Sequence, residues 1–149
     1  MRRRLESGKL DVGAFPQPFA ANEWAKGGVR TLFTSKNAVP FGSDLIVLVV
    51  TLDLAEKHPD VLRAFLSDLL SATKFFIEHT KEAKQALLDT KIVAIPPSVF
   101  LTMQDNLRAP DGRTDLDRLN KLQDLLLADN FITKKADLSK FLDLSYLPK

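Results

Sequence analysis

Few side chains in this sequence are of the types that carry acid–base or metal chemistry. His58 and His79 stand near the two ends of one expected helix, and the rise of an α-helix separates them by about 30 Å. At that distance the two imidazoles cannot share a metal ion or a proton. The aspartates and glutamates form no pair at catalytic spacing. The sequence therefore predicts no catalytic residue and no metal site.

The absence of cysteine removes further kinds of chemistry. A chain without cysteine has no disulfide framework, no thiolate zinc site and no cysteine nucleophile. The six glycines are scattered rather than gathered in a phosphate-binding loop, and the Gly-x-Ser-x-Gly motif of serine hydrolases is absent. We therefore expect no cofactor and no enzymatic activity.

The composition is typical of one soluble domain. The 149 residues are 45% hydrophobic and 27% charged, with a net charge of +2. Three of the positive charges are consecutive arginines at 2–4, and the rest of the chain is close to neutral, so we expect no nucleic-acid partner. The longest apolar run, LIVLVV at 45–50, is too short to span a bilayer, and no apolar segment of a signal peptide follows Met1.

The apolar pattern predicts an α/β fold, with strands before residue 55 and mostly helices after it. Short strands are expected at 11–15 and 29–33, and the β-branched run 45–50 is typical of a central strand in a covered sheet. A short helix is expected at 18–24, and a loop at 34–43. The later helices are expected at 59–77, at 80–89 with Thr80 as cap, at 98–107, after Thr114 or Asp115, and after Asp137.

The run 45–50 needs neighbours that this chain does not supply. Only two weak strand candidates remain for it, and exposing its six apolar side chains costs on the order of 10 kcal/mol. Two explanations follow. Either the chain is the C-terminal portion of a longer protein, or it associates with a second copy through an unpaired sheet edge.

Three stretches, in this order, resemble periplasmic solute-binding proteins of ABC importers. LESGKLDVGAFPQPFA resembles a segment of the binding proteins for nitrate, sulfonates, taurine and thiamine-pyrimidine precursors. LIVLVVTLDLAEKHPDVLRAFLSDLLSATKF is similar to a later segment of that family, and LQDLLLADNFITKKADLSKFLDLSYL is similar to its C-terminal end. The likeness runs from Leu5 to Leu147, and EKHPDVLRAF and NFITKKADL are its more specific parts.

The resemblance implies the C-terminal portion of a type II periplasmic binding protein fold, with two lobes joined by a hinge. Residues 1–35 would be a remnant of the second lobe, 36–44 the hinge crossing, and 45–149 part of the first lobe. The implied function is the substrate-binding component of an ABC importer for a small anionic or heterocyclic solute, in truncated form. The implied partners are that solute and a membrane permease, and the implied location is periplasmic or lipid-anchored outside the cytoplasm.

The resemblance also implies a ligand site formed by two loops. Glutamine and serine side chains would hydrogen-bond a polar head group, phenylalanines would pack against an apolar body, and an aspartate would meet an amine. Two of these residues also have an interpretation without a ligand. Gln17, between two prolines, can be a turn residue, and Asp44 can be a residue at the start of a strand that faces water. The residues implied as ligand contacts are Phe15, Gln17, Phe19, Phe41, Ser43 and Asp44.

The sequence departs from the family at two places. Pro16 and Gln17 stand where family members often carry tryptophan and an acid. Asn130 replaces the usual glycine before Phe131, and because asparagine tolerates a left-handed turn we still expect the helix to stop there. Two other functions remain open: a non-catalytic interaction module or remnant, and an enzyme related to thiamine-pyrimidine synthesis, against which the lack of cysteine argues.

Overall fold

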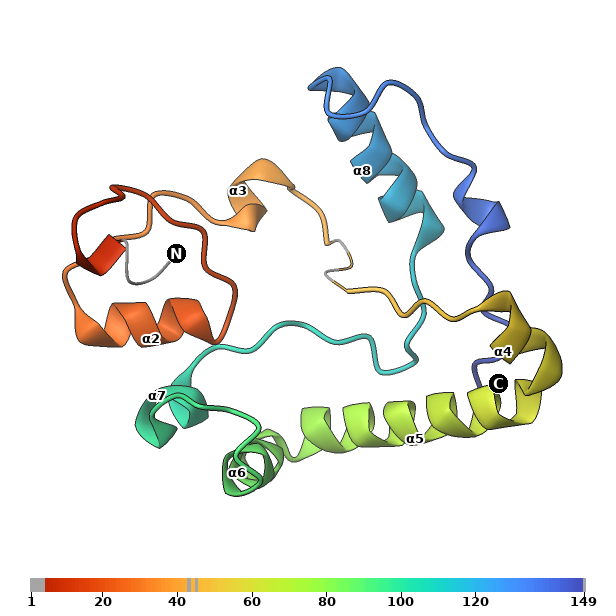
Figure 1. Cartoon of the computed structure of the whole chain (residues 1–149), viewed down its shortest axis with the longest axis horizontal. Coiled ribbons are helices and arrows are strands. Elements are labelled where there is room, and N and C mark those ends of the chain that lie inside the picture. Colours follow the sequence, from red (N-terminus) through yellow and green to blue (C-terminus); the bar gives the residue numbers. More distant parts are fainter. Residues whose placement is uncertain (1–4, 43, 45, 149) are drawn as a thin grey trace. The chain divides into compact units, whose positions relative to one another are not determined.

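The computed structural model describes residues 5–42, 44 and 46–148. Over these residues the chain consists of helices joined by irregular segments, without a strand or a sheet (Figure 1). The predicted α/β class, and with it the type II periplasmic binding protein fold, is therefore wrong: the structure is mostly helical. The chain divides into a first unit, residues 1–30 with 79–107, and a second unit, residues 31–78 with 108–149. The domain boundaries expected at 35 and 44 stay a prediction.

The three segments expected as strands are irregular in this structure. Residues 12–16, 29–33 and 46–50 have no regular secondary structure, and residue 45 lies outside the described part. The backbone hydrogen bonds found among the described residues join none of these segments to another. A strand is stable only when it is paired, and β-propensity expresses how well a side chain fits an existing sheet. The composition of 46–50 is therefore suited to a sheet that the described chain does not form.

The first unit packs short helices around small and aromatic side chains. Its helix α7 packs against both α2 and α6. Ala21, Ala83 and Phe100 are the buried apolar side chains that these helices contribute. The helix expected at 18–24 starts one residue later. The described helices of this unit are α2 (Phe19–Lys26), α6 (Thr80–Asp89) and α7 (Pro97–Thr102).

The second unit contains the longest described helix (Figure 1). Leu62 and Leu70, both on that helix, are its buried apolar side chains. The short helix at 52–57 packs against this long helix. The long helix begins at Pro59, directly after His58, which ends the short one. The described helices of this unit are α3 (Ser35–Ala38), α4 (Leu52–Lys57), α5 (Pro59–Glu78), α8 (Leu116–Ala128) and the 3-10 helix η1 (Leu138–Lys140).

Several helix ends lie where the sequence places them. α5 begins at Pro59, and α8 follows Asp115, whose carboxylate accepts a hydrogen bond from the Arg118 N–H at 3.1 Å. Asn130, with φ 59°, stops α8: the Phe131 N–H donates to the Leu126 carbonyl at 2.8 Å, the pattern of a Schellman motif. The expected left-handed turn at Asn130 is thus confirmed.

Other helix ends differ from the prediction. Residues 34–43, expected as loop, contain α3, because Thr34 and Asn37 form a capping box. His79, not Thr80, is the N-cap of α6. The helix expected at 98–107 ends at Thr102, where Met103 turns to extended backbone. Asp137 is the N-cap of η1, but its side chain makes no capping hydrogen bond.

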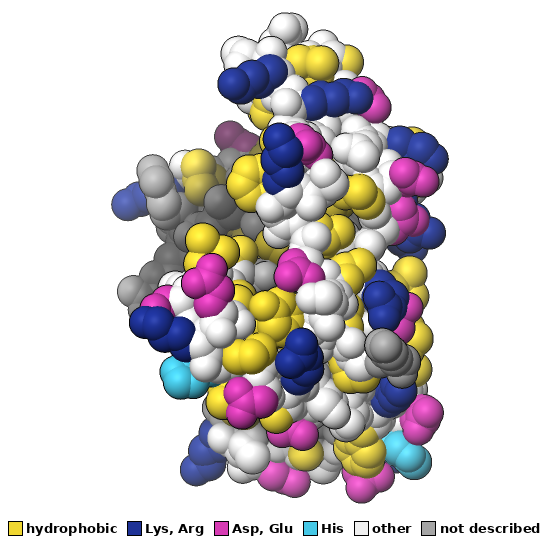
Figure 2. All heavy atoms as spheres, turned by 90° about the vertical axis from the view of Figure 1, so that its right-hand side faces the viewer, with side chains coloured by type: hydrophobic (Ala, Val, Ile, Leu, Met, Phe, Trp, Pro, Cys, Tyr) yellow, Lys and Arg dark blue, Asp and Glu magenta, His cyan; other side chains and the backbone are white. Residues whose placement is uncertain are grey.

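Many apolar side chains lie on the surface. Ile46 is 80% exposed and Val49 is 87% exposed. Figure 2 shows hydrophobic side chains exposed beside lysines, arginines and acids on the face that it views. Among the described residues, none of the helices has the length and apolar character needed to cross a membrane.

Candidate functional site

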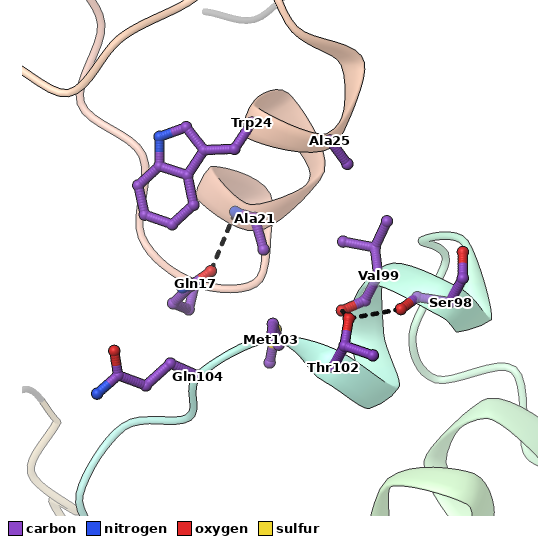
Figure 3. Close-up of a pocket in the computed structure, with 9 residues that line it drawn as sticks. All are labelled: Gln17, Ala21, Trp24, Ala25, Ser98, Val99, Thr102, Met103 and Gln104. Atoms are coloured by element: carbon purple, nitrogen blue, oxygen red, sulfur yellow. Dashed lines mark hydrogen bonds between the residues drawn. The ribbon is translucent and has the colours of Figure 1, made fainter.

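A pocket of about 400 Å³ lies within the first unit, between α2 and α7 (Figure 3). One wall consists of Gln17, which precedes α2, and of Ala21, Trp24 and Ala25 on that helix. The other wall consists of Ser98, Val99 and Thr102 on α7 and of Met103 and Gln104 directly after it. All nine lining residues are uncharged. Amide, hydroxyl, indole and apolar groups therefore meet in one place.

Helical spacing explains the α2 wall. Positions 21, 24 and 25 are three and four residues apart and share one face of the helix. Gln17 is held at the start of the helix because its Oε1 accepts a hydrogen bond from the Ala21 N–H at 3.1 Å. That bond satisfies one of the N–H groups that a first helical turn leaves open. The amide NH₂ of Gln17 remains as a donor group at the pocket.

The α7 wall is a short helix that begins at a proline pair. Pro96 and Pro97 suit the start of a helix because its first N–H groups have no intrahelical partner. Thr102 donates its hydroxyl proton to the Ser98 carbonyl at 2.7 Å. Its oxygen lone pairs can therefore accept a hydrogen bond from a bound molecule.

A buried lysine supports the segment that follows α7. Lys84 on α6 is only 3% exposed, and its Nζ donates to the Met103 carbonyl at 2.9 Å. The same ammonium lies 3.6 Å from a carboxylate oxygen of Asp105 and 5.7 Å from the centre of the Phe100 ring. A carbonyl, a carboxylate and an aromatic face together compensate the burial of this charge. Lys84 thereby fixes the backbone that carries Met103 and Gln104.

Among the predicted ligand contacts that the structure describes, Gln17 alone lines this pocket. Phe15 is half-buried and Phe19 is 56% exposed, and both lie in the first unit outside the lining. Phe41, half-buried, and Asp44, exposed, belong to the second unit. The remaining predicted contact, Ser43, lies outside the described residues.

No signal in the sequence indicates the residues that line the pocket together with Gln17. Trp24 lies three residues after Ala21 and directly before Ala25, so the helical repeat places these three side chains on one side of α2. The α7 residues come from a segment more than 80 residues after Gln17, and no local pattern indicates that pairing.

Among the described residues, no group of three or more histidines or acids could hold a metal ion. Hydrogen bonds from the Ser139 side chain lower the pKa of Asp137, and hydrogen bonds from Ser145 lower the pKa of Asp143. Both carboxylates are exposed and belong to the second unit.

Comparison of the chain with models of protein families, with curated proteins and with solved structures finds no match. The resemblance to solute-binding proteins of ABC importers therefore stays a prediction from the sequence.

Proposed function

We propose that this chain is the substrate-binding component of an ABC importer and binds a small solute without changing it. One observation carries the proposal. Gln17, indicated by the sequence as a ligand contact, lines the pocket of the first unit together with Trp24. The ordered resemblance of three stretches supports the class of protein. We place the solute-binding site in the helical first unit.

The chemistry of the lining suits reversible binding. Ligand sites in proteins are concave and largely apolar, with a few polar groups that fix the orientation of the ligand. Here Trp24, Val99 and Met103 supply apolar contact, while Gln17 and Thr102 supply a donor and an acceptor. The proposed partner of the loaded protein is a membrane permease, and the proposed location is the periplasm or the outer side of the cytoplasmic membrane.

Calorimetry on the 149-residue chain tests this function. The chain is titrated with nitrate, which is an anion, with taurine, a zwitterion that carries a sulfonate group, and with the neutral heterocycles cytosine and nicotinamide. We expect saturable one-to-one binding of at least one of them, and chromatography of the mixture should recover that solute unchanged. Heats equal to dilution for all four solutes would contradict the proposal, and so would conversion of a solute.

A second candidate is a stand-alone interaction module. It is favoured by the exposure of residues 46–50, an irregular apolar segment whose backbone makes no hydrogen bond that is found among the described residues. Such a segment is a template for pairing with another chain. This function predicts self-association without saturable binding of any of the four solutes.

A further inference from the structure

We infer that the pocket of the first unit takes a flat, uncharged heterocycle with hydrogen-bonding groups on its edge, in preference to an anion. This inference rests on the proposed function and deepens it by naming the class of solute. Three features of the pocket carry it: an accessible indole, two primary amides, and backbone N–H groups that are already occupied.

The indole of Trp24 supplies a flat surface for stacking. The residue is 49% exposed although it lines the pocket, so part of the ring is accessible to a bound molecule. In Figure 3 the indole and the Gln104 amide extend to the same side, with Gln17 between them. Aromatic rings favour offset stacking with other flat rings, and this contact requires no charge on the ligand.

The two amides can bind the edge of a heterocycle. A primary amide offers both donors and an acceptor, and it therefore pairs with ring nitrogens, carbonyls and amino groups. Gln17 uses its oxygen at the start of α2, which leaves its NH₂ as a donor. Gln104 is exposed and carries both kinds of group. A ligand with an acceptor facing Gln17 satisfies the donor that remains there.

Three N–H groups at the start of α2 are not available to an anion. Helix N-termini bind anions through N–H groups that have no partner. Here the N–H groups of Ala20 and Asn22 donate to the carbonyls of Pro16 and Pro18 at 3.2 Å each, and that of Ala21 donates to Gln17. These donors are therefore occupied before a ligand arrives.

The nearby cation is also occupied. Lys84 is 3% exposed, and its ammonium binds the Met103 carbonyl and faces Asp105. An anion in the pocket would find no countercharge among the nine lining residues. A neutral ring needs none.

Calorimetry and two substitutions test the inference. Nicotinamide or cytosine should bind the chain, and taurine and nitrate should bind at least tenfold more weakly. Trp24→Leu removes the stacking surface and should weaken heterocycle binding about tenfold. Gln17→Glu retains the oxygen that accepts from Ala21 but replaces the NH₂ donor with an acceptor, and it should weaken binding about tenfold.

Matched substitutions outside the lining serve as controls. Phe141→Leu changes an exposed aromatic residue outside the lining, and Gln85→Glu makes the same charge change as Gln17→Glu on α6. Both controls should bind the heterocycle as the parent does. Trp24→Phe is compared with Trp24→Leu, and it should recover part of the affinity if stacking is the cause of the loss. Circular dichroism at the titration temperature verifies that each variant is folded.

The outcomes separate the two claims. Binding of taurine or nitrate in preference to both heterocycles would overturn this inference and leave the proposed function in place. Heterocycle binding that neither Trp24→Leu nor Gln17→Glu weakens would overturn the assignment of the ligand to this pocket. If none of the four solutes binds, the proposed function fails, and the inference fails with it.

Discussion

Lys84 combines deep burial with three kinds of compensating partner, and it determines where the chain runs after α7. Its ammonium binds the Met103 carbonyl at 2.9 Å and lies near the Asp105 carboxylate. Replacing it with methionine keeps most of the apolar stem but removes the charge. The carbonyl of Met103 would lose its donor, and Asp105 would lose its cation.

We expect Lys84→Met to lower the free energy of unfolding by about 2 kcal/mol, because a hydrogen bond from a buried charged group is lost. Urea denaturation measures this change. Lys81→Met, at an exposed position on the same helix, is the control and should change stability little. Equal unfolding midpoints for the parent and Lys84→Met would show that Lys84 does not support this segment.

Asp137 gives a prediction of pH dependence at a single residue. The Ser139 hydroxyl donates to its carboxylate at 2.6 Å, and this bond lowers the pKa of Asp137 below its ordinary value of 3.8. A carboxyl whose pKa is lowered by folding contributes stability above its unfolded pKa. That contribution is lost as the pH falls through the lower pKa of the folded state.

The titration of the Asp137 carboxyl carbon by NMR measures this shift. In the parent chain we expect a pKa below 3.8, and in Ser139→Ala a pKa closer to that value. Asp143, whose pKa is lowered instead by Ser145, should be unaffected by Ser139→Ala and serves as an internal control. An unchanged titration of Asp137 in the variant would refute the assigned cause.

Among the helices, α8 has a capping interaction at its start and a left-handed residue at its end. Asp115 caps its start through a hydrogen bond from the Arg118 N–H. We expect Asp115→Ala to destabilise the chain by about 1 kcal/mol, the usual cost of a lost N-cap. Asp115→Asn keeps the capping oxygen without the charge, and it should restore most of that loss in thermal or urea unfolding. If Asp115→Asn is as unstable as Asp115→Ala, the ion pair with Arg118 matters more than the cap.

Helices and strands differed in how well the sequence predicted them. The start of α5 at Pro59, the cap of α8 and the turn at Asn130 follow from signals that lie within a few residues, and all three are found. The three expected strands are absent from the described residues because a strand depends on partners that no local signal supplies. The same limit applies to the pocket. Gln17 stands out by its two flanking prolines, whereas its pairing with α7 depends on contacts distant in sequence.

At the scale of the whole chain, the apolar surface has a measurable consequence. Residues 46–50 are apolar and exposed, and exposed apolar surface promotes association. We expect the elution volume in size-exclusion chromatography to fall as the protein concentration rises, and we expect Val49→Lys to reduce this change. Ile92→Lys is the control, because Ile92 is also exposed but lies outside this segment. A monomer at every concentration would contradict the expectation.

We propose that the pocket between α2 and α7 binds a small solute. Trp24 is the only tryptophan of the chain, and it lines this pocket, so its fluorescence reports on the site directly. The most direct measurement is a titration of that emission with nicotinamide and cytosine, excited at a wavelength that the solutes do not absorb. We expect a saturable change in emission whose midpoint agrees with calorimetry. Saturable heat without any change in Trp24 emission would contradict it, because the solute would then bind elsewhere.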